Sequence, residues 1–126
     1  MVQAIVIEGQ TVDADGILTL HVDQKIRLKI APEQAQKQAN SFVHLEISTQ
    51  LHAQPPLLVI GEDDKVVWRV PIHLTFPSFG DVGSIGFLHV DPTTGDIDTS
   101  PATIQNLTEK ADALASRFAS PTAHPI

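Results

Sequence analysis

The stretch Val66-Val-Trp-Arg-Val-Pro-Ile-His-Leu-Thr-Phe76 alternates between two kinds of side chain. Apolar side chains stand at every second position, and a second set that includes Arg69 and His73 stands between them. A period of two is typical of a β-strand, which directs successive side chains to opposite faces of a sheet. Pro71 removes one main-chain donor, so we expect this strand at a sheet edge or with a bulge.

Shorter apolar runs flank this strand. Residues 57–60 precede it and are separated from it by the turn sequence Gly61-Glu-Asp-Asp64. Residues 84–90 follow it after a loop over residues 77–83, and the segment Asp91-Pro-Thr-Thr-Gly-Asp96 then gives a strong turn signal. These patterns predict an antiparallel sheet of two or three strands.

Two helices are predicted beside this sheet. The first runs from Pro32, a residue suited to the first helical position, to about Leu51, and the second runs from Pro101 to Phe118 after the capping residue Ser100. Apolar residues recur in both at steps of three and four, which gives each helix one apolar stripe. Residues 119–126 contain two prolines and no pattern, so we expect a frayed tail. The predicted body is therefore an α-β-β-α unit over residues 32–118.

The first 31 residues are predicted to form a separate β-meander. Residues 2–7 are apolar on both faces, the stretch Thr11-Val-Asp-Ala-Asp-Gly16 supplies a turn, and Lys25-Ile-Arg-Leu-Lys-Ile30 alternates with a period of two. Such a small piece cannot bury its own apolar face, so it must pack on the rest of the chain or on another copy, and symmetric pairing of two copies is a common solution. We therefore expect a homodimer of an α+β protein, with residues 1–31 as the dimerisation element.

Composition narrows the function classes. The 126 residues include no cysteine, which excludes disulfides, thiolate catalysis and cysteine-bound metals. Eight Lys and Arg against fifteen Asp and Glu give a formal charge of −7, which argues against a general nucleic-acid binder. Neither a signal peptide nor an apolar run of membrane-spanning length is found, so we expect a cytoplasmic protein with no membrane partner.

Arg69 and His73 share the polar face of the long strand, and His89 would join them if residues 66–76 and 84–90 pair. A guanidinium and imidazoles together can hold an anion or a carboxylate, so these three residues are the candidate ligand site. The alternative is an ordinary solvent-facing sheet surface. No Ser, Asp or Glu stands at a spacing that predicts a nucleophile and its base.

Three other groups offer weaker chemistry. Lys25, Arg27 and Lys29 form one basic row that could contact an acidic partner or nucleic acid, or could simply protect a sheet edge by charge. His44, Glu46 and His52 do not have the spacing of metal ligands on a helix. The acidic segments near Asp13, Glu62 and Asp91 lack the ligand spacing of a calcium-binding loop. Asp and Gly are also the residues that ordinary hairpin turns use, so we expect turns there. The sequence thus predicts no metal and no cofactor.

Two resemblances to known families add to this. Residues 2–9, 15–18 and 24–30 resemble the N-terminal hairpin of AbrB-like, swapped-hairpin antitoxins, which implies a dimer with interleaved strands. The rest of the chain is similar to PepSY-like α-β-β units, through the predicted helix, Val67-Trp-Arg-Val-Pro-Ile72 and His89-Val-Asp-Pro-Thr-Thr-Gly-Asp96. Such units are usually binding or inhibitory modules rather than enzymes. The combination also resembles short proteins of cyanobacteria and related bacteria.

The leading hypothesis is a non-enzymatic protein-interaction module, antitoxin-like or a regulatory partner of another protein. Its basis is the hairpin resemblance together with the lack of a catalytic constellation. The alternative is a small-ligand-binding protein or a modest enzyme that uses the Arg69, His73 and His89 face.

Overall fold

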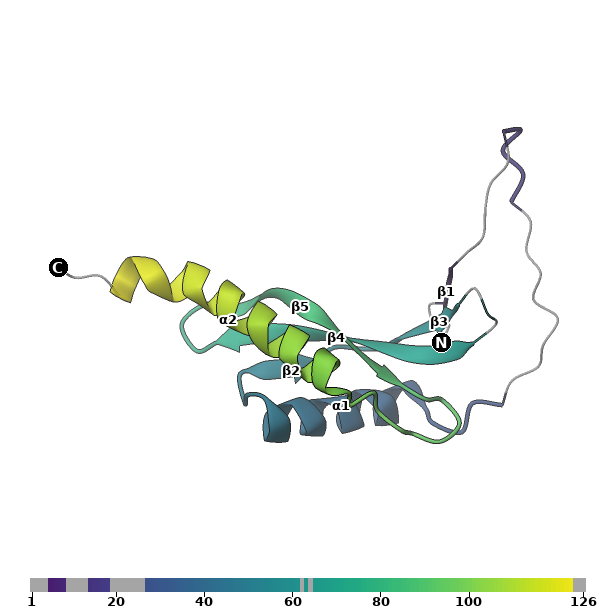
Figure 1. Ribbon diagram of the computed structural model, residues 1–126, viewed down its shortest axis with the longest axis horizontal. Helices are drawn as coiled ribbons and strands as arrows, with labels where there is room; N and C mark the ends of the chain where they lie inside the picture. Colours follow the sequence, from purple (N-terminus) through teal and green to yellow (C-terminus); the bar gives the residue numbers. More distant parts are fainter. Residues whose placement is uncertain (1–4, 9–13, 19–26, 62, 64, 124–126) are drawn as a thin grey trace.

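The computed structural model describes residues 5–8, 14–18, 27–61, 63 and 65–123, with the side chains of residues 119–123 left out. Within these residues the fold is α+β, as predicted, with two helices and five strands (Figure 1). In chain order the elements are β1 (Ile5–Ile7), α1 (Pro32–Glu46), β2 (Leu51–Ala53), β3 (Leu57–Ile60), β4 (Val66–Phe76), β5 (Gly80–Val90) and α2 (Pro101–Ala123). Neither helix in this part of the chain has the length and apolar character needed to cross a membrane.

The long strand β4 organises the sheet. It pairs antiparallel with β5 on one side, and on the other side it pairs first with β3 and then with β2. β1 extends the sheet beyond β3 and runs parallel to it. The sheet is therefore mixed and has five described strands rather than the two or three predicted, because two segments of only three residues join it.

Pro71 lies where β3 gives way to β2 along β4. The last β3 partner on β4 is Arg69 and the first β2 partner is Ile72, so the missing donor of Pro71 falls in the gap between them. The Pro71 carbonyl accepts the N–H of Gln54, in the connection between the two strands, at 2.8 Å. An edge position for this strand is thus wrong, whereas the register shifts after Ile72 and Leu74 agree with the expectation of a bulge.

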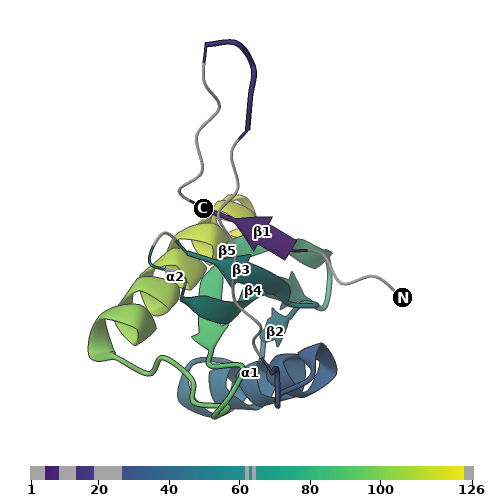
Figure 2. The same ribbon diagram turned by 90° about the vertical axis from the view of Figure 1, so that its right-hand side faces the viewer.

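Both helices cover the same face of the sheet (Figure 2). The face that they cover carries the even-numbered residues of β4, which are buried with the inner stripes of α1 and α2. Trp68 lies in this core with 1% of its surface exposed, and its indole N–H donates to the Ile30 carbonyl at 2.8 Å. The other face carries the odd-numbered residues of β4 and has no helix over it in the described part of the chain.

Four local predictions need correction. α2 runs to Ala123, past the predicted end at Phe118, so residues 119–123 are helical and not part of a frayed tail. Arg27 to Ile30 form no strand; instead the N–H groups of Lys29 and Ile30 both donate to the Pro92 carbonyl, which places Ile30 in the core. The first helix ends at Glu46 rather than near Leu51, because β-branched residues follow and residues 51–53 gain strand partners on β4. β5 begins at Gly80, which leaves only residues 77–79 in the turn.

Candidate functional site

The uncovered sheet face carries the residues that the sequence singled out. Arg69 and His73 lie on β4, and the register places His89 of β5 directly opposite Arg69. His73 lies two pleats further along, opposite Ser84. The structure thus unites Arg69 with His89 and leaves His73 apart from them.

Arg69 is engaged on three sides. Its Nε–H donates to His89 Nε2 at 3.2 Å, and its two terminal nitrogens contact the carboxylate of Glu8 at 3.3 Å. Its guanidinium carbon stands 5.4 Å from the centre of the Phe87 ring, within the range of a cation–π contact. Glu8 follows β1 directly, so this cluster ties the end of β1 to β4 and β5.

The hydrogen bond from Arg69 requires a neutral His89, because only the neutral ring has an acceptor nitrogen. Burial, and then the positive charge of Arg69, lower the pKa of His89 below its ordinary value of 6.5, while Asp98 and Glu8 act in the opposite direction. The cluster can hold a carboxylate in a charge-assisted contact. Glu8 of the same chain already supplies that carboxylate, so the contacts are internal to the chain. We call this cluster of Glu8, Arg69 and His89 the clasp.

His73 belongs to a second cluster on the same face. Its Nδ1 lies 2.7 Å from Oδ2 of Asp81, and this contact, together with the Gly83 N–H, lowers the pKa of Asp81. His73 is paired across the strands with His52, whose ring meets that of His44 edge-on at 5.3 Å between centroids. His52, His73 and His89 thus lie on the sheet, whereas His44 belongs to α1. In the residues that the structure describes, no three His, Cys, Asp or Glu side chains are arranged to hold a metal ion.

The acidic turns and the basic row have simple local settings where they are described. Asp91 accepts the N–H groups of Thr93 and Thr94 and the Thr93 hydroxyl, bonds that lower its pKa and close the turn. Asp13, Glu62 and Asp64 lie outside the described residues, as does Lys25. Arg27 and Lys29 are exposed and lie on irregular chain, so they form no strand face.

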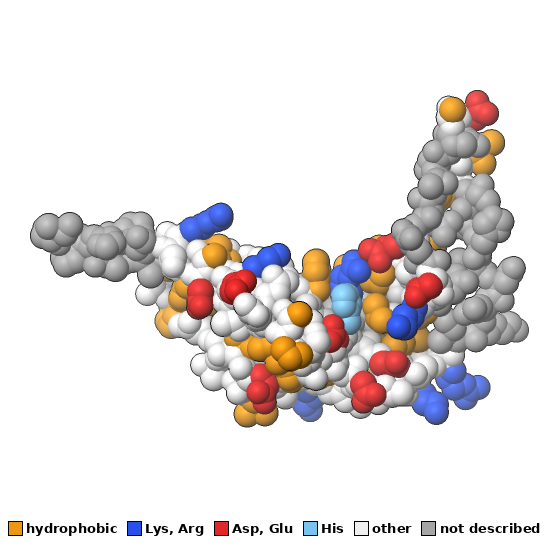
Figure 3. All heavy atoms as spheres, viewed as in Figure 1, with side chains coloured by type: hydrophobic (Ala, Val, Ile, Leu, Met, Phe, Trp, Pro, Cys, Tyr) orange, Lys and Arg blue, Asp and Glu red, His pale blue; other side chains and the backbone are white. Residues whose placement is uncertain are grey.

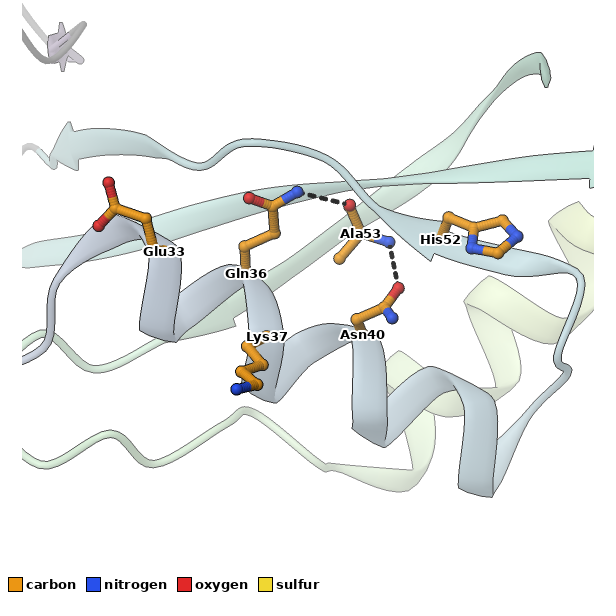
Figure 4. A pocket seen from close by; sticks show the side chains of 6 residues that line it. All are labelled: Glu33, Gln36, Lys37, Asn40, His52 and Ala53. Carbon is orange, nitrogen blue, oxygen red and sulfur yellow. Dashed lines mark hydrogen bonds between the residues drawn. The ribbon is translucent and has the colours of Figure 1, made fainter.

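A polar hollow of about 400 Å³ lies between α1 and the outer edge of β2 (Figure 4). Two side chains of α1 reach across it to the main chain of Ala53: Gln36 donates to the carbonyl at 3.0 Å, and Asn40 accepts the N–H at 2.9 Å. These amides occupy the positions that a neighbouring strand would use. At this hollow, side chains of α1 therefore bind the main chain of the β2 edge in place of a further strand.

Sequence reasoning missed Glu8, Asp81 and Phe87. Glu8 reaches Arg69 across 61 residues, and no local pattern signals that contact. Asp81 and Phe87 could have been found from the register of β4 with β5, which the alternating pattern alone does not fix. No protein-family model, curated protein or solved structure matches the chain, so the AbrB-like and PepSY-like resemblances remain predictions.

Proposed function

We propose that this protein is a non-enzymatic interaction module that binds a second polypeptide, and that its first partner is a second copy of the same chain, so that it forms a homodimer. One observation carries the proposal. Of the seven exposed large apolar side chains among the described residues, four belong to the first 31 residues: Ile5, Ile17, Leu18 and Leu28.

Of these four side chains, Ile17 and Leu18 are the best candidates for the dimer contact. They are 57% and 53% exposed, they are adjacent in sequence, and the described turn over residues 14–18 stands apart from the sheet and both helices (Figures 1 and 2). Burying two such side chains against a partner is worth about 2–4 kcal/mol, enough to contribute substantially to a micromolar dimer. The clasp between Glu8 and Arg69 supports the same reading, because it anchors the chain just before this turn to the body.

The charged groups on the uncovered sheet face support a role other than catalysis. Arg69 is engaged by Glu8 and His89, and His73 by Asp81. A regulatory or antitoxin-like role would follow if the completed dimer presents a surface to a further protein.

Sedimentation equilibrium tests the proposal. We expect the wild-type chain to have the mass of a dimer at micromolar concentration, and an I17D/L18D variant to have the mass of a monomer while keeping the wild-type circular dichroism spectrum. The L45D variant is the matched control, because Leu45 is 83% exposed on α1 and lies outside the proposed contact. A wild-type monomer, or a double variant that remains dimeric, would overturn the proposal.

A further inference from the structure

A groove of about 400 Å³ runs between the outer edge of β5 and α2. Its strand side is formed by residues 84–87, and its helix side includes Lys110, Leu114 and Arg117. These two cations are the charged residues among those that line it, in a chain whose formal charge is −7. Figure 3 shows blue side chains along α2, on the side turned away from α1.

The main chain of Phe87 faces this groove. The His89 carbonyl accepts the N–H of Asp98, so the main chain of His89 points away from β4. Main-chain groups alternate in direction along a strand, and the register with β4 is regular from Val90 to Phe87. Phe87 therefore also directs its N–H and carbonyl outward. In the described part of the chain no other main-chain or side-chain group bonds to them.

The position of α2 keeps this edge accessible while covering the neighbouring face. A Cβ on Gly86 would lie 3.0 Å from Leu107 of α2, so the helix packs closely on the strand at that point. The helix then presents Leu114 and two cations beside the edge, none of which can accept the Phe87 N–H. A polar strand edge is thus left next to an apolar patch and two positive charges.

We propose that this groove binds an acidic peptide in extended conformation, which adds to the sheet as a strand beside β5. Main-chain hydrogen bonds to Phe87 supply the pairing, and acidic side chains of the peptide contact Lys110 and Arg117. These two cations are seven residues apart on the helix, about 10 Å along its axis. Side chains on one face of an extended chain recur about every 7 Å, so carboxylates two or four peptide positions apart bracket this distance and can reach both cations. This surface is separate from residues 14–18 and does not depend on the proposed dimer.

Fluorescence anisotropy with the full chain and a labelled peptide of alternating Glu and Thr tests this inference. We expect saturable binding, and we expect a K110E/R117E variant to bind about tenfold more weakly, since two partly exposed ion pairs are lost. The matched control is K37E/K65E, which changes the net charge equally at two exposed positions away from the groove. This control variant should bind nearly as well as the wild type.

Two altered peptides test the mode of binding. A peptide of alternating Gln and Thr should bind about as weakly as the groove variant binds the acidic one. An acidic peptide with N-methyl groups at alternate positions should lose binding, because it cannot pair with a strand. Absence of binding by the unmodified peptide, equal losses in the two double variants, or undiminished binding of the methylated peptide would each overturn the inference. A monomeric wild-type chain that binds the peptide would contradict only the dimer.

Discussion

The outer edges of β2 and β5 both lie beside a helix, but among the described residues only at β2 do side chains of that helix form hydrogen bonds to the main chain of the edge. At β2 the N–H and carbonyl of Ala53 are both bound by α1, through Asn40 and Gln36. At β5 the main chain of Phe87 has no such partner in the described residues. The difference arises from the side chains that each helix directs at its edge.

Gln36 and Asn40 stand four residues apart and so share one side of α1. An amide side chain offers both a donor and an acceptor, so two of them can replace a neighbouring strand. The corresponding side of α2 carries Lys110, Leu114 and Arg117. Lys110 and Arg117 can only donate hydrogen bonds, and Leu114 can neither donate nor accept one. A helix beside a sheet edge therefore closes it only when its side chains match the pattern of the edge.

Removing the two amides should have the largest effect on stability. In a Q36L/N40L variant the main-chain groups of Ala53, which is 7% exposed, would lose both hydrogen bonds while remaining covered. We expect the free energy of unfolding to fall by about 2–4 kcal/mol. Urea denaturation measures it, and the slope with denaturant should stay unchanged.

The matched control for this edge is Q34L/S41L, at two exposed positions of α1. It adds the same kind of side chain to the helix and should change the free energy of unfolding by less than about 0.5 kcal/mol for each position. If both double variants lose stability equally, the amides do not close the edge.

At the other edge, Gly86→Ala should have the next largest effect. Gly86 has a φ of +147° and would bring its new Cβ to 3.0 Å from Leu107, whereas Gly83 has a φ of +123° and no atom within 4 Å of a Cβ. Both substitutions strain the backbone, by about 1–2 kcal/mol. Only Gly86→Ala also displaces α2, which should cost about 1 kcal/mol more. Thermal or urea unfolding of the two variants gives the difference, and equal losses would show that α2 is not held at this point.

The fold class and the longest elements could be predicted because periodicity reports burial directly. β4 alternates over eleven residues and was predicted at its observed bounds, and the apolar stripe of α2 located its start at Pro101, although the helix continues to Ala123. β1 lies within the strand predicted over residues 2–7, but the sequence did not indicate its pairing with β3, and β2 has only three residues, too few for a period to appear. The segment ending at Ile30 has the alternation of a strand, but the Trp68 indole and the Pro92 carbonyl take its main-chain groups instead.

The candidate site was predictable to the same extent. Arg69 and His89 meet because two well-patterned strands pair, which was the condition of the prediction. The partners that decide their chemistry are Glu8 for Arg69 and Asp81 for His73. Asp81 depends on the register of β4 with β5, and Glu8 depends on the pairing of β1 with β3, neither of which the pattern fixes. Sequence alone therefore located the polar face, while the structure showed that its charges are engaged within the chain.

The smallest expected effect concerns pH at the end of β5 where the clasp lies. The pKa of His89 is lower in the folded chain than its ordinary value of 6.5, through burial and Arg69, against Asp98 and Glu8. Its neutral form therefore stabilises the fold above about pH 6.5, and this contribution is lost as the pH falls through that value towards the lower folded pKa. The bonds that lower the pKa of Asp81, Asp91 and Asp98 are lost only near or below pH 3.8, outside this window.

An H89Q variant isolates this term, because Gln keeps a polar side chain on β5 but does not titrate. Urea unfolding at about pH 7.5 and about pH 5.5 should show a smaller loss of stability on acidification in H89Q than in the wild type, by less than about 1 kcal/mol. The other histidines contribute equally to both proteins, so the difference reports His89 alone. Equal losses would mean that protonation of His89 leaves the Arg69 contact undisturbed.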